Sequence, residues 1–362
     1  MEQRDYWYLL GVTEGFGAVT VKRLMSLYGS PDVICTTETL PISSRQQEAL
    51  RKNLREAERL LGERDALEKK GIRWCCQGDP HYPERLRMIP DPPVLLYYRG
   101  ELPSEEKRTA GIIGARRCSA YGRSMAEYFG RELAKAGLQV ISGMAMGVDG
   151  YAQSAALAAG GRSFGILGCG VDIAYPMVNR PLYERLQEQG GVLSEFTPGT
   201  PPLPQHFPLR NRIISGLSDV LLVIEARKVS GTLITVDQAL EQGKDVLALP
   251  GRVGDPLSEG CNHLIRQGAG ILTGTDEVLQ LLGMQADPDG TSALKGAEAA
   301  PADRLSEQEK KVLGLLSHDP MHLEELMKRT GLGLGTLSLI LLSLEERGLV
   351  KPVSGNQYIR VF

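Results

Sequence analysis

The sequence predicts an α/β protein built on a Rossmann-like, doubly wound, mostly parallel sheet. Short apolar runs recur along the middle of the chain, and stretches with helical periodicity separate them. Strands that are apolar at every residue are buried on both faces, which is typical of a parallel sheet covered by helices. Composition agrees, because 42 glycines in 362 residues is a large excess over the usual ~7%.

The central strands and helices follow in order. We expect strands at 110–114, 138–142, 163–167, 191–194, 220–224 and 246–249, and a shorter edge strand at 271–272. We expect the intervening helices at 124–136, 151–159 and 234–242. These elements make residues 108–284 a Rossmann-like core.

The N-terminal part has a different pattern. Residues 1–70 predict a helical domain, in which Gly15-Phe16-Gly17 between two helices is typical of a helix-hairpin-helix or SAM-like fold. Such a hairpin can offer backbone N–H groups to a phosphate. Only Lys22 and Arg23 are basic nearby, so packing alone is the favoured interpretation. Prolines mark residues 71–107 as a connector joining the core, without long helices.

The C-terminal part predicts a winged helix at 304–362, after a flexible linker at 285–303 that is rich in Ala, Gly, Pro and Asp. Ser306 and Glu309 form a capping box that opens the first helix. The second and third helices are expected at 323–329 and 334–347, and a wing hairpin at 350–361.

Charge and composition exclude several classes of protein. The net charge of -3 excludes a protein that coats nucleic acid through bulk positive charge. Residues 108–275, however, hold thirteen arginines and three lysines against fourteen acidic residues. The six cysteines lack zinc spacing and the five histidines do not cluster with them, so we expect no metal and reduced thiols. Without a signal peptide or a long apolar run, we expect a cytoplasmic protein with no membrane partner.

The usual catalytic and nucleotide motifs are missing. Gly168-Cys169-Gly170 lacks the third glycine of a dinucleotide fingerprint, and the chain has no Walker A sequence. Asp149 and Asp172 follow strands and are expected to serve turns or helix caps. We therefore expect no enzymatic activity and no cofactor.

Residues that directly follow the strands should share one edge of the sheet, where ligands of such folds bind. They include arginines, hydroxyls, glycines and aromatic rings, a combination suited to a single-stranded nucleic acid. Ser230 is placed to cap the next helix, and Phe207 or Tyr121 is placed to stack a base.

The sequence resembles the DprA (Smf) family of DNA-processing proteins. The resemblance is strong over residues 70–285 and rests on Gly114…Arg116…Ser119…Tyr121-Gly122, Ser142-Gly143-Met144-Ala145 and the specific block Phe207-Pro208-Leu209-Arg210-Asn211-Arg212. It implies a cytoplasmic homodimer that binds single-stranded DNA, protects incoming DNA in natural transformation and delivers it to the recombinase RecA.

The resemblance also implies which residues bind. The single-stranded DNA site would comprise Arg116, Arg117, Ser119, Tyr121, Gly143, Asn179, Phe207, Arg210, Asn211, Arg212, Ser230, Gly231 and Thr232. Leu264 and Ile265 are the expected dimer residues, with plain helix core as the alternative.

Two other functions stay open. The stretch from Arg210 to Ala239 also resembles LOG-type phosphoribohydrolases, whose motif aligns with Ser230–Thr235. Thr235 stands where that family has its catalytic Glu, and a threonine cannot take the carboxylate's role. The winged helix could instead read duplex DNA as a regulator. Its third helix has Arg347 as its one basic residue, which favours a protein contact or packing.

Overall fold

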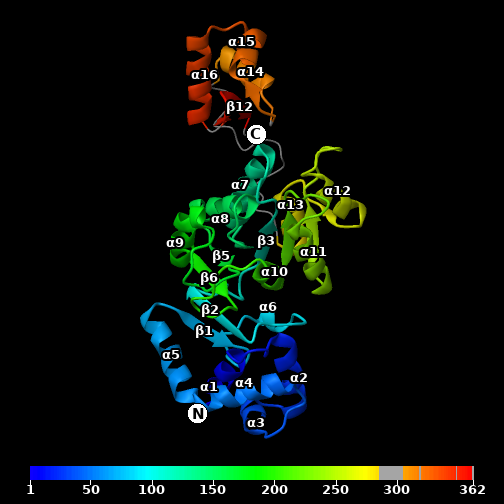
Figure 1. Ribbon diagram of the computed structural model, residues 1–362. Helices are drawn as coiled ribbons and strands as arrows, with labels where there is room; N and C mark the ends of the chain where they lie inside the picture. The colour runs from blue at the N-terminus through cyan, green and yellow to red at the C-terminus, as the bar shows by residue number, and fades with distance from the viewer. Residues whose placement is uncertain (285–304, 318, 348, 361–362) are drawn as a thin grey trace.

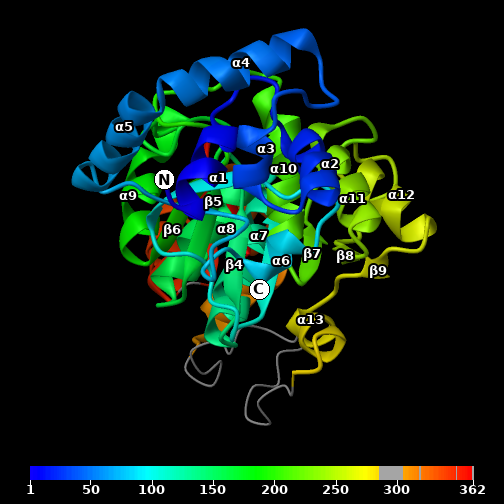
Figure 2. The ribbon, with the colours of Figure 1, turned by 90° about the horizontal axis from the view of Figure 1, so that it is seen from below.

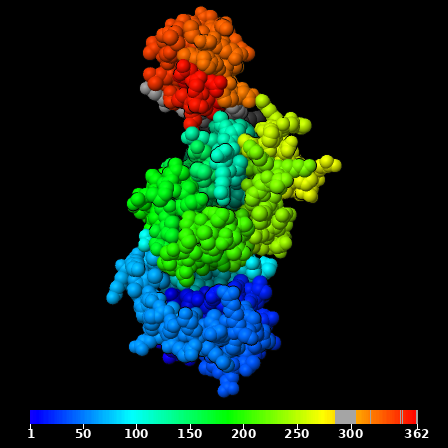
Figure 3. Space-filling view, viewed as in Figure 1, coloured from blue at the N-terminus to red at the C-terminus, as the bar shows by residue number. Residues whose placement is uncertain are grey.

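The computed structural model describes residues 1–284, 305–317, 319–347 and 349–360. Three lobes follow one another in space as they do along the chain: an N-terminal helical lobe, a central α/β body and a small C-terminal lobe (Figures 1 and 3). The linker expected at 285–303 lies outside the described residues. None of the described helices combines the length and the apolar character needed to cross a bilayer.

The central body is a nine-stranded sheet with the order β1-β2-β6-β5-β4-β3-β7-β8-β9. Its strands are β1 (Arg73–Cys76), β2 (Leu95–Gly100), β3 (Thr109–Ile113), β4 (Gln139–Ser142), β5 (Ser163–Ile166), β6 (Gly190–Ser194), β7 (Val220–Val223), β8 (Asp245–Ala248) and β9 (Gly270–Ile271). From β6 to β9 every pairing is parallel, whereas β1 and β2 pair antiparallel. The predicted fold class is confirmed.

Helices cover both faces of this sheet (Figures 1 and 2). One face carries α7 (Ala120–Lys135), α8 (Val148–Ala158) and α13 (Thr275–Leu281); the other carries α6 (Glu84–Arg87), α10 (His206–Leu217), α11 (Gly231–Glu241) and α12 (Glu259–Arg266). The neighbours Ile112 and Ile113 belong to the two different cores, as alternation along a strand requires. The turn η1 (Met177–Asn179) and α9 (Arg180–Glu188) lie between β5 and β6.

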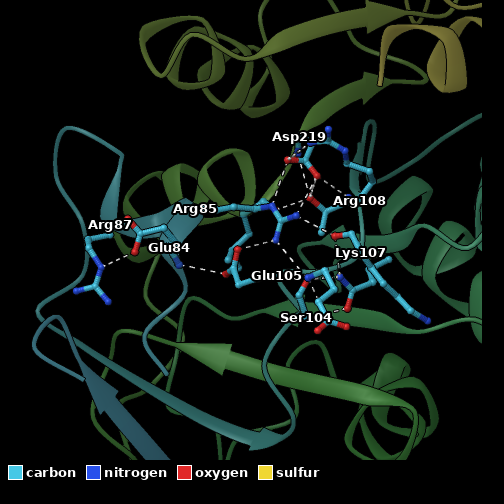
Figure 4. Close-up of polar contacts among 12 residues, drawn as sticks. Glu84, Arg85, Arg87, Ser104, Glu105, Lys107, Arg108 and Asp219 are labelled. Atoms are coloured by element: carbon cyan, nitrogen blue, oxygen red, sulfur yellow. Dashed lines mark hydrogen bonds and ion pairs between the residues drawn. The ribbon is translucent and has the colours of Figure 1, made fainter. Parts of the chain in front are cut away.

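The proline-rich segment expected as a connector contributes more structure than its sequence suggested. It supplies β1, β2 and α6, and the two strands extend the sheet beyond β6. The prolines lie outside these short strands, so they leave the ladder hydrogen bonds intact. Arg85 on α6 fixes the segment to the body, because it donates to Asp219 at the start of β7 and to Glu105 (Figure 4).

The N-terminal lobe consists of five helices: α1 (Gln3–Gly11), α2 (Ala18–Tyr28), α3 (Pro31–Thr36), α4 (Ser44–Arg55) and α5 (Ala57–Lys69). Its core continues into the sheet, since Trp74 of β1 and Tyr97 of β2 pack into it. The two basic side chains of the hairpin serve the fold, because Lys22 donates to the carbonyl of Pro90 and Arg23 to that of Pro41.

The C-terminal lobe is a winged helix with its own core. It contains α14 (Glu307–Leu315), β10 (Met321–His322), α15 (Leu323–Thr330), α16 (Leu334–Glu346), β11 (Val350–Val353) and β12 (Gln357–Arg360). The capping box of Ser306 and Glu309 is present, and Gly331 ends α15 in the left-handed conformation at φ 74°. The winged helix is therefore confirmed, with Val361 of the expected wing outside the described residues.

Candidate nucleic-acid interface

A groove of about 630 Å³ opens at the carboxyl edge of the parallel strands. The loop after β3, the start of α10 and the loop that leads from β7 into α11 form its walls. A small pocket of about 30 Å³ adjoins it and shares several of its lining residues. The expected site residues that line one or both are Arg116, Arg117, Gly143, Phe207, Arg210, Asn211, Ser230, Gly231 and Thr232.

Arg116, Arg117 and Arg227 are exposed cations that line this groove, and the first two were expected from the sequence. Arg116 and Arg117 follow β3, and neither forms an ion pair with another described residue. The guanidinium of Arg116 lies 5.3 Å from the ring centroid of Phe207, which steadies it over the groove. Guanidinium groups without an ion-pair partner can bind phosphates, and beside an aromatic ring they can also contact a base.

The aromatic surface of the groove is a stacked pair. The rings of Tyr175 and Phe207 lie 5.6 Å apart at an interplanar angle of 28°, and both line the groove. The sequence prediction missed Tyr175, although its place after β5 is a signal that strand-end reasoning could have used. Met146, Met177 and Val178 add exposed apolar side chains along the same edge.

The N-terminus of α11 is open toward the groove. Ser230 holds the N-cap position, but its side chain makes no capping hydrogen bond, contrary to our expectation. Its hydroxyl is buried and has no partner among the described residues. Free N–H groups and an unbonded hydroxyl at the positive end of a helix are suited to an anion.

The N-terminus of α7 is instead occupied by the protein itself. Ser119 caps it by accepting from the N–H of Gly122, and the buried carboxylate of Glu225 accepts from the N–H and the hydroxyl of Ser119. A side chain at position 122 would collide with that carboxylate, because an added Cβ would lie 2.2 Å from it. Burial raises the pKa of Glu225. Ser119 therefore serves the framework and does not line the groove.

Arg210 lines the groove but is bound inward. Only 4% of it is exposed, and its guanidinium donates to the carbonyls of Gly143 and Ile166 at the ends of β4 and β5. Burial lowers its pKa to about 10, while nearby Asp149 favours the charged form. Asp149, in the first turn of α8, accepts from the N–H of Gly143 and so ties this helix to the loop after β4. Arg210 thus fastens α10 to the sheet edge.

Arg212 does not reach the groove. Its guanidinium forms a two-pronged ion pair with Glu195 and a further one with Asp91, and 7% of its side chain is exposed. The expected contact between Arg212 and a phosphate is therefore not supported by its position. In the Phe207–Arg212 block, Arg212 therefore has a structural role, as the cation of a buried ion pair.

The loop after β4 is held in a strained shape. Met144 adopts a positive φ of 52°, which is unfavourable for a side chain. Asn179, expected at the site, donates to the carbonyls of Met144 and Ala145 and so supports this loop without lining the groove. Gly143 is required there, since an added Cβ would lie 2.7 Å from Arg210.

Three further expected residues also face inward. Tyr121, in the first turn of α7, packs half-buried against the core, and burial raises its pKa. Leu264 is buried, and Ile265 packs half-buried against the same core. Within one chain, Leu264 and Ile265 make the contacts of a helix core, which is the alternative to a dimer contact given above.

The groove offers no carboxylate in the place of the phosphoribohydrolase Glu. Thr235 occupies that position, lines the groove and is 3% exposed. In the part of the chain that the structure describes, no three His, Cys, Asp or Glu side chains are placed to hold a metal ion.

The fold and groove define a Rossmann-like protein whose open edge is chemically suited to a phosphodiester strand. The family model for DNA recombination-mediator protein A matches residues 73–283, and that for the DprA winged helix domain matches residues 296–356. This chain belongs to the DprA family of DNA-processing proteins.

Individual relatives agree. Protein Smf of Synechocystis is 31% identical over 99% of both chains. The X-ray structure of DNA processing protein A from Streptococcus pneumoniae is similar with a TM-score of 0.66 and 33% identity, covering 79% of this chain and 100% of that one. A structure concerning the single-stranded DNA binding mode of the Helicobacter pylori protein is similar with a TM-score of 0.52 and 29% identity, covering 58% and 95%.

Proposed function

We propose that this chain binds single-stranded DNA in the groove at the carboxyl edge of its sheet. Arg116 and Arg117 take phosphates, Tyr175 and Phe207 stack bases, and the open end of α11 takes a further phosphate through Ser230, Gly231 and Thr232. The observation that carries the proposal is the pair of unpaired, exposed arginines beside a stacked aromatic pair. The single-stranded DNA binding described for the Helicobacter pylori relative supports it.

The remaining expected residues act indirectly in this proposal. Arg210 in α10, with Gly143 and Asn179, holds the groove in shape, and Asn211 accepts a hydrogen bond from the guanidinium of Arg210. Ser119 and Glu225 fix the loop that carries Arg116. Tyr121 and Arg212 belong to the core and to an ion pair.

Fluorescence anisotropy with a labelled single strand and with a duplex of the same sequence tests the proposal. The single strand should bind more tightly, because its bases are free to stack on Tyr175 and Phe207. Equal affinity, or tighter duplex binding, would contradict it. Incubation with nucleoside monophosphates should release no free base, because Thr235 cannot act as the missing Glu.

The biological role implied by the family resemblance is part of the proposal. The chain, as a homodimer, would protect incoming strands in natural transformation and deliver them to RecA for homologous recombination. In a RecA ATPase assay on strands coated with single-strand-binding protein, wild-type protein should stimulate RecA, and Arg116→Ala/Arg117→Ala should not. Equal stimulation by wild type and by the double variant would show that delivery to RecA does not depend on the groove.

A further inference from the structure

The third helix of the winged-helix lobe, α16, presents an apolar face to solvent. Leu334, Leu339 and Leu342 are 53%, 70% and 53% exposed. They are the exposed large apolar side chains in the described part of this lobe. The opposite side of α16 already fills the lobe's core with Leu337, Ile340, Leu341 and Leu344, so the core does not need the exposed leucines.

This face is unsuited to DNA. Residues Leu334–Glu346 contain no Lys, Arg, Asn or Gln, the side chains that read base edges from a recognition helix. Figure 1 shows α16 along one flank of the lobe, clear of the central body. An exposed apolar stripe of this kind is typical of a protein contact.

The pattern of the stripe fits a second copy of itself. Gly335, Ser338, Leu339 and Leu342 share one face, because they are three or four residues apart. If two α16 helices pair antiparallel about a two-fold axis between Ser338 and Leu339, each Leu342 lies opposite Gly335 and each Leu339 opposite Ser338. Large residues then meet small ones at every position, as close helix packing requires. Space is available, since nothing lies within 4 Å of an added Cβ at Gly335.

Charge is complementary in the same arrangement. Glu345 near the end of α16 would approach the partner at the end of α15, where Lys328 is exposed. Neither side chain forms an ion pair with another described residue. The helix dipoles also run opposite, which favours an antiparallel pair.

We propose that α16 is a self-association surface through which two winged-helix lobes pair. Two leucines per copy bury less than the ~1,200 Å² of a stable interface, so the contact is weak and depends on concentration. Copies bound side by side on one DNA strand would meet at high effective concentration. That consequence rests on the proposed function, whereas the self-association does not.

Sedimentation velocity of the full chain, from low micromolar to near-millimolar concentration and without DNA, tests the proposal. Wild-type protein should show a concentration-dependent association step, whatever dimer the central body forms. Leu339→Glu places two carboxylates in the contact and should weaken that step about tenfold or more. Leu27→Glu, at a leucine that is 62% exposed on α2, is the matched control and should leave the step unchanged.

Charge reversal adds specificity. Glu345→Lys and Lys328→Glu should each weaken the step, and the double variant should restore it. The proposal is overturned if wild-type protein shows no concentration-dependent step, if Leu339→Glu associates like wild type, or if Leu27→Glu weakens association as much. Loss of DNA binding would bear on the groove and leave these outcomes unaffected.

Discussion

Two pairs of arginines near the groove have opposite surroundings. Arg116 and Arg117 follow β3, are exposed and form no ion pair with described residues. Arg210 and Arg212 on α10 are 4% and 6% exposed, and carbonyls or carboxylates occupy their guanidinium groups. All four were expected to bind DNA. The difference indicates that the first pair is available to a ligand, while the second builds the wall on which the ligand lies.

The strongest test of this difference is Arg212→Ala. Removal of the guanidinium leaves Glu195 and Asp91 without their shared partner, so the free energy of unfolding should fall by about 3 kcal/mol. Chemical denaturation measures it. A variant of unchanged stability with reduced DNA affinity would place Arg212 with the ligand-binding pair.

The next largest effect is expected for Arg116→Ala/Arg117→Ala. Affinity for single-stranded DNA should fall about 10- to 100-fold, because two phosphate contacts are lost. Stability should change by less than about 0.5 kcal/mol, since both side chains are exposed and unpaired. Fluorescence anisotropy gives the DNA affinity and chemical denaturation gives the stability of the same preparation. A loss of stability with unchanged affinity would assign Arg116 and Arg117 to the framework instead of the ligand.

Two tyrosines should differ in the same way as the two pairs of arginines, Tyr175 as a ligand contact and Tyr121 as part of the framework. Tyr175→Ala removes one ring of the exposed stack and should weaken binding about tenfold, while Tyr175→Phe keeps the ring and should bind like wild type. Tyr121→Phe, in the first turn of α7, should not alter affinity, because the ring packs against the core. Titrations with one oligonucleotide compare all three, and tight binding by Tyr175→Ala would remove the stack from the site.

The two serines give the smallest and sharpest contrast. Ser230→Ala should lower affinity about threefold and leave stability unchanged, because its hydroxyl has no partner in the free protein. Ser119→Ala should cost about 1 kcal/mol of stability through the lost cap. The interpretation fails if the two variants exchange these effects.

The sequence predicted the fold well where the signal is local. Apolar runs such as Val220–Val223 are buried on both faces and became parallel strands, and the capping box of Ser306 formed as its spacing indicates. β1 and β2 were missed because they are short and belong to a segment in which prolines are frequent.

The site was predicted less completely, for a physical reason. Whether an arginine faces a ligand depends on partners far along the chain, and Asp91 lies 121 residues from Arg212. The same holds for Ser119, whose role is set by Glu225, 106 residues away. Motifs located the groove, and only the three-dimensional packing distinguished its ligand-facing residues from its framework.

The salt dependence of single-stranded DNA affinity tests the central claim most directly. The slope of log affinity against log salt concentration should be smaller for Arg116→Ala/Arg117→Ala than for wild type by about 1.4, the value for two phosphate contacts on a single strand. Arg45→Ala, which removes an exposed arginine from the N-terminal lobe, is the control and should keep the wild-type slope. An unchanged slope in the double variant would contradict the assignment of these two arginines to the phosphates.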